Sequence, residues 1–386
     1  MRILINVPDL NVIGGKANYY TALQHQFTQE VAYFTYGSRG KKEGKISTAF
    51  RMITDYFQFF RVIRKTRPDL VLLNPSLEFK GFFRDGIFFF IASLLPVKVV
   101  VFWRGWSPSF EKTATTKYWW FMKRTFMKAD AKIVLAEEFV EKVKSWGFKK
   151  PVYQETTVVD QRLVDGLTEV EIIKKLQDTS EVNLLFLARL ERNKGIFEIL
   201  ESYETLKPRF PNLTLSIAGT GGAYKEVETH IQNHKLKDVE MLGFVQESAK
   251  KDAFHHADIY LFPSTHGEGM PNSLLEAMGC GLPVITTPNA GIKDFFEDGK
   301  MGLILEEVTA RLLTQKIEQL LEDQNLRTKI STHNFHYAKA RFHANVVARR
   351  LENICLDVLS GATVSRSEKT AFPSPQQQPG YNTRVE

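Results

Sequence analysis

Short apolar segments alternate with longer segments of mixed apolar and polar residues along most of the chain. The short segments have the character of buried parallel strands, and the longer ones have the spacing of helices. In the first part of the chain, the expected strands are residues 2–7, 31–36, 97–103 and 129–136, with another beginning after Pro68. The expected helices between them are residues 17–29, 50–67, 86–95, 117–128 and 139–146. This alternation predicts a doubly wound, Rossmann-like domain.

The alternation pauses at residues 151–180, where a short strand, a loop and a helix are typical of a linker, and then restarts. The second set of expected strands is 183–187, 213–218, 239–244, 259–262 and 282–286. An amphipathic helix is expected at 343–359, and the Ser-, Thr-, Pro- and Gln-rich residues after Gly361 predict a disordered tail.

A length of 386 residues suits two domains of ordinary size. We expect an α/β chain with two Rossmann-like domains facing a central cleft. The expected boundaries are 1–165 for the first domain, 166–342 for the second domain with the linker, 343–360 for the last helix and 361–386 for the tail.

The most informative stretch is residues 258–288. An apolar strand is followed by a loop from Pro263 to Gly269 and by a helix that begins near Pro271. Loops at the carboxyl ends of strands bind ligands in open α/β sheets. The start of this helix offers an anion site at the backbone N–H groups of Asn272, Ser273 and Leu274.

Two carboxylates flank this helix start, Glu268 in the loop and Glu276 further along the helix. A phosphate bound there would have a carboxylate on each side, and carboxylates accept hydrogen bonds from ribose and sugar hydroxyls. The pattern therefore fits a nucleotide-sugar. The alternatives are a capping box, Ser273-x-x-Glu276, and a solvated acid at Glu268.

Two cations, Arg189 and Lys194, occupy another loop of the second domain. Departure of the leaving group from a nucleotide-sugar builds negative charge on the diphosphate, which fixed cations stabilise more in the transition state than in the ground state. The alternative is a solvated loop with ordinary surface cations.

Taken together, these motifs resemble those of the retaining GT-B glycosyltransferases, the large family usually numbered 4. The resemblance rests on Glu268-Gly269, Glu276-Ala277-Met278, Gly281-Leu282-Pro283-Val284 and Arg-x-x-x-x-Lys-Gly ending at Gly195. It covers about residues 1–360, strongly in the second domain and weakly in the first. It implies a GT-B fold whose last helix packs back on the first domain, and front-face transfer of a sugar to a hydroxyl acceptor with retained configuration.

The resemblance also implies roles for single residues. Glu268 would lie near the donor sugar hydroxyls, as nucleophile or positioning group, and Glu276 on the ribose, with Arg189 and Lys194 on the diphosphate. The glycine-rich turn with Gly219 and Gly221 would lie near the donor, and the loop with Phe244 and Val245 near the base; a simple strand end is the alternative for the latter.

The first domain departs from the family pattern. Arg104-Gly105 ends a strand where many relatives have His-Gly, whose histidine contacts the donor sugar. An arginine there implies an acidic donor sugar, an anionic acceptor or a changed geometry. Gly14 and Gly15 form a strand-to-helix loop that lets backbone approach a phosphate or sugar, or that is a plain turn.

Charge is divided unevenly between the two halves. Residues 1–150 contain 25 Lys/Arg and 12 Asp/Glu, whereas residues 151–386 contain 26 and 32. The basic half predicts an anionic partner such as phospholipid or a phosphorylated acceptor; nucleic acid is disfavoured because no nucleic-acid module is recognisable.

A basic stripe beside tryptophan is expected on the helix at 117–128 and predicts contact with an anionic membrane surface. Its residues are Lys117, Trp120, Arg124 and Lys128. A second apolar segment of the same domain contains Phe82, Phe83, Phe88, Phe89 and Phe90. The alternative is a solvated basic face over an ordinary core.

The sequence disfavours several classes of protein: disulfide-linked, metal-binding, secreted and membrane-spanning. Two distant cysteines, Cys280 and Cys355, predict neither disulfides nor a metal cluster and favour a reducing, cytoplasmic compartment. The first residues have no signal-peptide pattern, and no apolar stretch reaches the length of a membrane span. No Asp-x-Asp pair occurs, so a metal-held diphosphate is not expected, and we expect no cofactor because the nucleotide-sugar is a substrate.

The sequence therefore predicts a glycosyltransferase that acts on a lipid-linked or growing cell-surface glycan, at the inner face of the cytoplasmic membrane. The rival interpretations are a noncatalytic nucleotide-sugar-binding protein and an epimerase or phosphorylase on the same fold.

Overall fold

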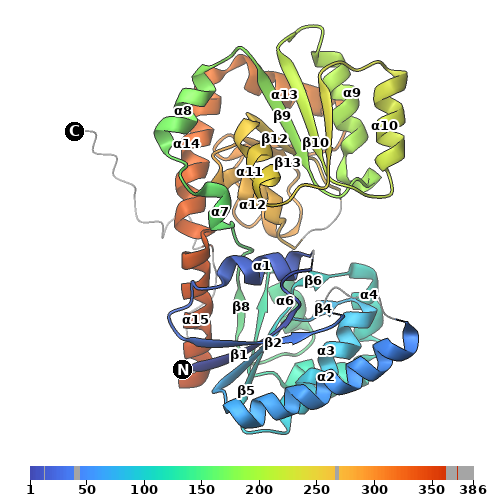
Figure 1. Ribbon diagram of the computed structural model, residues 1–386, viewed down its shortest axis with the longest axis vertical. Helices are drawn as coiled ribbons and strands as arrows, with labels where there is room; N and C mark the ends of the chain where they lie inside the picture. The colour runs from blue at the N-terminus through green and yellow to red at the C-terminus, as the bar shows by residue number, and fades with distance from the viewer. Residues whose placement is uncertain (13, 39–43, 266–268, 362–371, 373–386) are drawn as a thin grey trace, which may run out of the picture. The chain divides into compact units, whose positions relative to one another are not determined.

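The computed structural model describes residues 1–12, 14–38, 44–265, 269–361 and 372. Within these ranges the chain forms two compact α/β units (Figure 1). The first unit is Met1–Thr156 together with the chain from Ala348 onward, and the second unit is Thr157–Val347. Of the expected tail at 361–386, only Gly361 and Phe372 belong to the described residues.

The main sheet of the first unit has the strand order β2-β1-β3-β5-β7-β8, and all described neighbours are parallel. Its strands are β1 (Arg2–Pro8), β2 (Glu30–Tyr36), β3 (Leu70–Leu73), β5 (Lys98–Phe102), β7 (Ala131–Val134) and β8 (Val152–Gln154). Two short strands, β4 (Ser76–Leu77) and β6 (Gly105–Trp106), form a separate pair. The strand order reverses between β1 and β3, so the carboxyl ends of these strands border a switch point, where open sheets bind ligands.

Helices lie between the strands of the first unit, and a last helix returns to it. They are α1 (Gly15–Leu23), α2 (Lys45–Thr66), α3 (Phe79–Ser93), α4 (Pro108–Thr115), α5 (Trp119–Arg124), the 3-10 turn η1 (Phe126–Lys128), α6 (Glu137–Ser145) and α15 (Ala344–Ser360). In α15, the Glu352 carboxylate accepts hydrogen bonds from the backbone N–H groups of Thr28 and Gln29, both at 2.6 Å. The expectation that the last helix packs back on the first domain is confirmed.

The helix expected at 117–128 is wrong. Thr125 separates α5 from η1 with φ −119° and ψ −103°, outside the helical region. The break lets the side chain of Phe126 become fully buried, 4.8 Å from the ring of Trp103 and 5.4 Å from that of Phe82. Burial of a large aromatic ring outweighs the backbone hydrogen bonds that a continuous helix would add.

Phenylalanines of α3 form much of the aromatic core of the first unit. Phe82, Phe88 and Phe89 are buried, and the Phe88 ring lies 4.8 Å from Tyr56 and 4.9 Å from Phe59 of α2. These three residues are therefore not the membrane-facing segment that the sequence suggested.

The sheet of the second unit has the strand order β11-β10-β9-β12-β13-β14, again with all described neighbours parallel. Its strands are β9 (Val182–Leu187), β10 (Leu213–Ala218), β11 (Val239–Gly243), β12 (Ile259–Phe262), β13 (Val284–Thr286) and β14 (Gly302–Ile304). Here the switch point lies between β9 and β12. The two loops that the sequence predicted to bind the donor, after residues 183–187 and after residues 259–262, thus follow neighbouring strands.

The helices of the second unit cover its sheet. They are α7 (Gln161–Val164), α8 (Glu169–Gln177), α9 (Ile196–Leu206), α10 (Tyr224–Asn233), α11 (Glu247–His256), α12 (Asn272–Gly279), α13 (Ala310–Glu322) and α14 (Gln324–Arg341), with 3-10 turns η2 (Arg192–Lys194) and η3 (Ala290–Ile292). Among the described residues, no helix is both long enough and apolar enough to span a bilayer.

The first boundary between the units lies before the expected one at 165/166. Val159 donates its backbone N–H to the Phe342 carbonyl at 2.8 Å, and the Leu163 carbonyl lies 2.8 Å from His255 Nε2. Residues of the expected linker are therefore bonded to the second unit, because their backbone groups find partners there.

Candidate functional site

The loops after β9 and β12 are joined at the switch point of the second unit. Thr265 donates its backbone N–H to the Asn193 carbonyl at 2.9 Å. Gly195 has a φ of 74°, and a Cβ at this position would lie 2.5 Å from the Pro263 carbonyl oxygen. A larger residue would separate the two loops, so the Lys-Gly motif serves their close approach.

The glycine-rich loop after β10 packs against the same region. A Cβ on Gly219 would lie 1.9 Å from the Ala188 carbonyl oxygen, and one on Gly221 would lie 2.3 Å from that of Leu190. Gly219 also donates its N–H to the Gly243 carbonyl at 2.6 Å, next to exposed Phe244 and half-buried Val245. All the predicted donor loops that the structure describes therefore meet at one edge of the sheet.

The two predicted cations have different environments. Lys194 is only 2% exposed, and its Nζ lies 5.7 Å from the centre of the Phe262 ring at the end of β12. Arg189 is exposed and forms an ion pair with Glu191 at 3.0 Å. Lys194 is thus held at the switch point by its surroundings, whereas Arg189 is held by one surface ion pair.

Glu276 is buried, and among the described residues only one of its two carboxylate oxygens has a hydrogen-bond partner. Its Oε1 accepts a hydrogen bond from Nζ of Lys250 on α11 at 2.7 Å. Its Oε2 is buried, and none of the described residues hydrogen-bonds to it. A buried carboxylate oxygen without a donor is costly unless a ligand supplies one.

The capping-box interpretation of Glu276 is wrong. The N-cap of α12 is Pro271, which has no side-chain capping bond, and Ser273 lies inside the helix. Glu276 is therefore too far along α12 to cap it. The first N–H groups of α12, at Asn272, Ser273 and Leu274, are those that an α-helix leaves without an internal acceptor. Glu268 lies outside the described residues.

Sequence reasoning missed two polar groups near these loops. Lys250 belongs to no motif, and only the packing of α11 against α12 brings it to Glu276. Asn289 follows β13 and donates from Nδ2 to the Ser264 carbonyl at 2.5 Å. The rule that loops meet at the carboxyl edge of a parallel sheet could have identified Asn289, but nothing in the sequence indicated Lys250.

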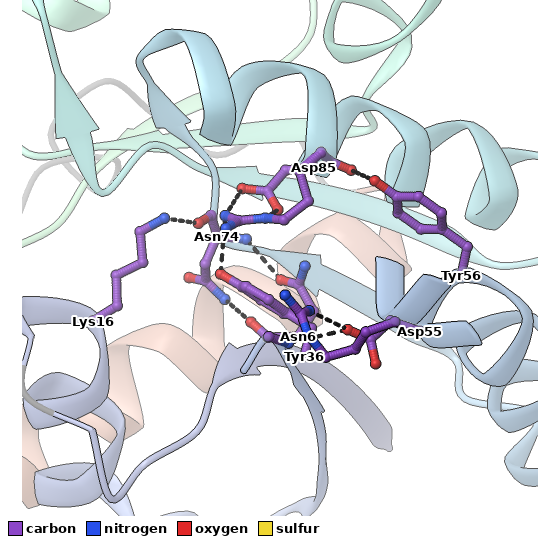
Figure 2. A network of polar contacts seen from close by, with 10 residues as sticks. Asn6, Lys16, Tyr36, Asp55, Tyr56, Asn74 and Asp85 are labelled. Atoms are coloured by element: carbon purple, nitrogen blue, oxygen red, sulfur yellow. Dashed lines mark hydrogen bonds and ion pairs between the residues drawn. The ribbon is translucent and has the colours of Figure 1, made fainter. Parts of the chain in front are cut away.

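A second polar region lies at the switch point of the first unit (Figure 2). Asn74, just after β3, donates from its backbone N–H to Asn6 Oδ1 and from Nδ2 to the Asn6 carbonyl, both at 2.9 Å. Nζ of Lys16 in α1 donates to the Asn74 carbonyl at 2.7 Å, and burial lowers the pKa of Lys16 to about 8. Gly14 and Gly15 precede it, and a Cβ on either would meet no described atom within 4 Å.

Beside this region, charged side chains anchor α2 and α3. Arg84 donates from Nε and Nη2 to the two carboxylate oxygens of buried Asp85, both at 2.8 Å. The hydroxyl of Tyr56, labelled in Figure 2, donates to the Arg84 carbonyl. Asp55 accepts from the N–H of Gly37 and pairs with Arg51 at 3.2 Å. These contacts satisfy the buried acids, and we assign them a structural role.

Arg104 is the least satisfied cation among the predicted residues. Its guanidinium carbon lies 3.7 Å from the centre of the Tyr19 ring and 4.6 Å from that of Phe102. Its Nε and Nη1 atoms are buried, and no described residue accepts a hydrogen bond from either. Burial lowers the pKa of Arg104, because the charged guanidinium loses solvation.

One group of potential metal ligands occurs among the described residues, formed by Glu204, His230 and His234. Nδ1 of His234 lies 2.9 Å from Glu204, and the two histidine rings stack with centres 4.1 Å apart. The group lies toward the carboxyl ends of α9 and α10. Because these helices run antiparallel to the strands that precede them, it belongs to the edge of the sheet opposite the donor loops.

Residues 168–336 match the family described as Glycosyl transferases group 1, and this range falls within the second unit. The capsular polysaccharide biosynthesis glycosyltransferase CapM of Staphylococcus aureus is 24% identical over 169 residues, which are 44% of each chain. A phosphatidyl-myo-inositol mannosyltransferase of Mycobacterium tuberculosis is 29% identical over 188 residues, which are 47% of this chain and 49% of the relative. In both cases the match spans less than half of the relative.

The solved structure of Anabaena HepE in complex with UDP and glucose is similar over 92% of this chain and 100% of its own, with a TM-score of 0.67 and 17% identity. This similarity extends beyond the family match and confirms the expected GT-B fold. The resemblance of the chain to the group 1 glycosyltransferases is therefore confirmed, through residues 168–336 of the second unit.

Proposed function

We propose that the chain is a retaining, metal-independent glycosyltransferase that moves a sugar from a nucleoside diphosphate sugar to a hydroxyl acceptor. The observation that carries the proposal is that Lys194, after β9, and Glu276, in the helix after β12, are both buried, and that Oε2 of Glu276 has no hydrogen-bond partner among the described residues. Lys194, a cation for the diphosphate, and Glu276, an acceptor for the ribose hydroxyls, thus follow the two strands that border the switch point.

The chemical step is a substitution at the anomeric carbon. The bond from this carbon to the β-phosphate oxygen breaks, and its electron pair leaves with the diphosphate. The acceptor hydroxyl oxygen forms the new bond on the same face of the sugar, and its proton passes to the departing phosphate oxygen. Negative charge grows on the diphosphate as the bond breaks, so Lys194, Arg189 and the first N–H groups of α12 stabilise the transition state most. In this step Glu268 positions the sugar. The alternative is that Glu268 is the nucleophile, in which case its carboxylate bonds to the anomeric carbon as the diphosphate leaves, and the acceptor hydroxyl then displaces the carboxylate in a second substitution.

The relatives support a nucleotide-sugar donor and a glycan or lipid acceptor. HepE binds UDP and glucose, CapM belongs to capsular polysaccharide biosynthesis, and the mycobacterial relative is a phosphatidyl-myo-inositol mannosyltransferase. The acceptor of this chain is accordingly a lipid-linked or growing cell-surface glycan, and the enzyme works in the cytoplasm at the inner face of the membrane.

Arg104 narrows the substrate further. Nε and Nη1 of Arg104 have no acceptor among the described residues, and an anionic group of the substrate would supply one. The donor sugar or the acceptor therefore carries an acidic group.

A thermal-shift panel of UDP-, GDP-, ADP- and dTDP-sugars tests the donor site. A ligand at 100 times its Kd stabilises the folded chain by about 2.7 kcal/mol, so one nucleotide series should raise Tm clearly. An unchanged Tm with every series contradicts the proposal. Within the nucleotide series that raises Tm, the glucose and glucuronate donors should then be compared. A larger Tm shift with the glucuronate donor would place the acidic group on the donor sugar.

Product analysis with and without acceptor separates the rival activities. Sugar transfer to a hydroxyl in the presence of EDTA supports the proposal. An isomerised nucleotide-sugar identifies an epimerase, release of sugar phosphate identifies a phosphorylase, and donor binding without turnover identifies a binding protein.

A further inference from the structure

The outer face of α2 is apolar and exposed. Ile46 is 88% exposed, Phe50 70%, Ile53 66% and Phe57 56%. Their spacing of four, three and four residues places them on one side of a helix, along three turns. Single exposed apolar residues are ordinary, but an aligned row of four large ones marks an interaction surface.

The core does not need this face, because α2 packs through the other side. Its buried residues are Asp55, Phe59 and Ile63, and the Phe59 ring lies 5.0 Å from Phe34 of β2. Phe50 and Phe57 therefore contribute exposed apolar area that the fold of the first unit does not use.

The charges of α2 are suited to an anionic surface. Arg61 lies over the Phe57 ring at 4.5 Å and Arg64 near the Phe60 ring at 5.8 Å, so the apolar row ends in two exposed arginines. Lys45 and Lys65 are exposed as well. The one acid of α2, Asp55, is buried and paired with Arg51, so the outer face presents cations without acids.

The neighbouring helix α3 also has exposed apolar residues. Ile87, Phe90 and Leu94 are exposed and follow the same helical spacing, and α3 contacts α2 through the rings of Phe88 and Tyr56. Figure 1 shows α2 as the long blue helix beside α3 in the first unit.

We infer that the outer face of α2 is the surface by which the chain binds an anionic lipid bilayer. An apolar row flanked by Lys and Arg is the composition of helices that lie in the bilayer interface, where apolar side chains enter the acyl boundary and cations meet lipid headgroups. Each Lys or Arg near an anionic leaflet strengthens the binding. A protein partner would also cover apolar area, but the absence of acids from this face favours lipid.

This inference replaces the membrane surface expected around Trp120. The short helix α5 exposes Trp120, but the break at Thr125 removes the continuous stripe to Lys128. The inference deepens the proposed function by naming the surface that would bring the first unit to a lipid-linked acceptor. Its test measures binding alone, so its failure leaves the transfer reaction untouched.

Vesicle flotation of the full chain tests the inference. Wild type should float with vesicles of phosphatidylcholine mixed with phosphatidylglycerol, less with phosphatidylcholine alone, and less at high salt. The double variant Phe50→Ser/Phe57→Ser should bind at least about 10-fold more weakly, since each lost ring contributes on the order of 1.5 kcal/mol or more when buried. Arg61→Gln/Arg64→Gln should lose binding to a similar degree, and only with the anionic vesicles.

Two matched variants serve as controls. Val170→Ser removes an exposed apolar residue from α8 of the second unit, and Trp120→Ser removes the exposed ring of α5. Both should float like wild type. An unchanged Tm and donor-induced Tm shift in every variant excludes misfolding.

Three results would overturn the inference. The first is the absence of flotation of wild type with anionic vesicles. The second is flotation that Trp120→Ser abolishes and the α2 variants leave intact. The third is a lipid-free dimer in light scattering that Phe50→Ser/Phe57→Ser converts to monomer without any vesicle binding, which would assign the face to a second copy of the chain.

Discussion

The two units are built alike but use their outer helices differently. In the second unit, α13 buries Leu313, Ile317 and Leu320 against the sheet. In the first unit, α2 buries Asp55, Phe59 and Ile63 and leaves a row of four apolar side chains in solvent. The second unit contains the family match and the proposed donor site, whose residues lie at backbone turns and include two buried charges. The first unit contains Arg104, whose Nε and Nη1 have no acceptor among the described residues, and an exposed apolar face. Features that bind the acceptor and a membrane surface should therefore be sought there.

The largest effect should come from the cation at the switch point of the second unit. Lys194→Ala should lower kcat by about 10²–10³, because a fixed charge at the departing diphosphate is lost. We expect Arg189→Ala to lower kcat in the same range if donor binding moves its side chain from Glu191 to the diphosphate. Arg192→Ala, which removes an exposed arginine paired with Glu226, is the control in the same loop. Steady-state rates equal to wild type in Lys194→Ala would remove the diphosphate assignment.

The second prediction tests whether the first unit selects an acidic substrate. Arg104→Met should lower kcat/KM by about 10–100-fold with a carboxylate- or phosphate-bearing substrate, the range for lost hydrogen bonds to a charged group. With a neutral analogue the change should be small. Arg104→Lys should not restore activity, because an ammonium lacks the planar fork. An equal loss with acidic and neutral substrates would indicate that Arg104 only supports Tyr19 and Phe102.

The third prediction separates binding from catalysis in the second unit. Glu276→Ala should raise the KM for the donor about 10-fold with little change in kcat, because a ribose contact is equally present in the ground and transition states. Lys250→Met should lower Tm more than Glu276→Gln does, because it leaves a buried carboxylate without its partner. A fall in Tm with unchanged KM in Glu276→Ala would mean that the Lys250–Glu276 pair is only structural.

The smallest expected effect concerns Lys132 in β7. This buried lysine lies 4.2 Å from the Phe148 ring, and burial lowers its pKa from 10.5 to about 7. Between these values the unfolded chain holds a proton that the folded chain has lost, so the free energy of unfolding rises with pH. Above pH 7, the Tm of wild type should therefore rise by about 2–4 °C per pH unit, and Lys132→Met should lack this rise. Identical pH profiles of Tm, measured between pH 7 and 9, would contradict this account.

The sequence by itself determined the two parallel sheets and most of the loops of the proposed donor site. Near-continuous apolar runs such as Leu70–Leu73 and Ile259–Phe262 fit only strands covered on both faces. Gly195, Gly219 and Gly221 belong to the motifs that resemble the family, and the structure places each against a neighbouring loop. These features are local, since they depend on a residue and its immediate chain neighbours.

Only the tertiary structure decided which face of a helix is buried and which charges meet. Packing of α2 against Phe34 and Phe88 turned Phe59 inward and left Ile53 and Phe57 in solvent. The contact of Lys250 with Glu276 joins two helices, and the break at Thr125 follows from burial of Phe126. In each case the deciding energy comes from contacts distant in sequence, which no local pattern encodes.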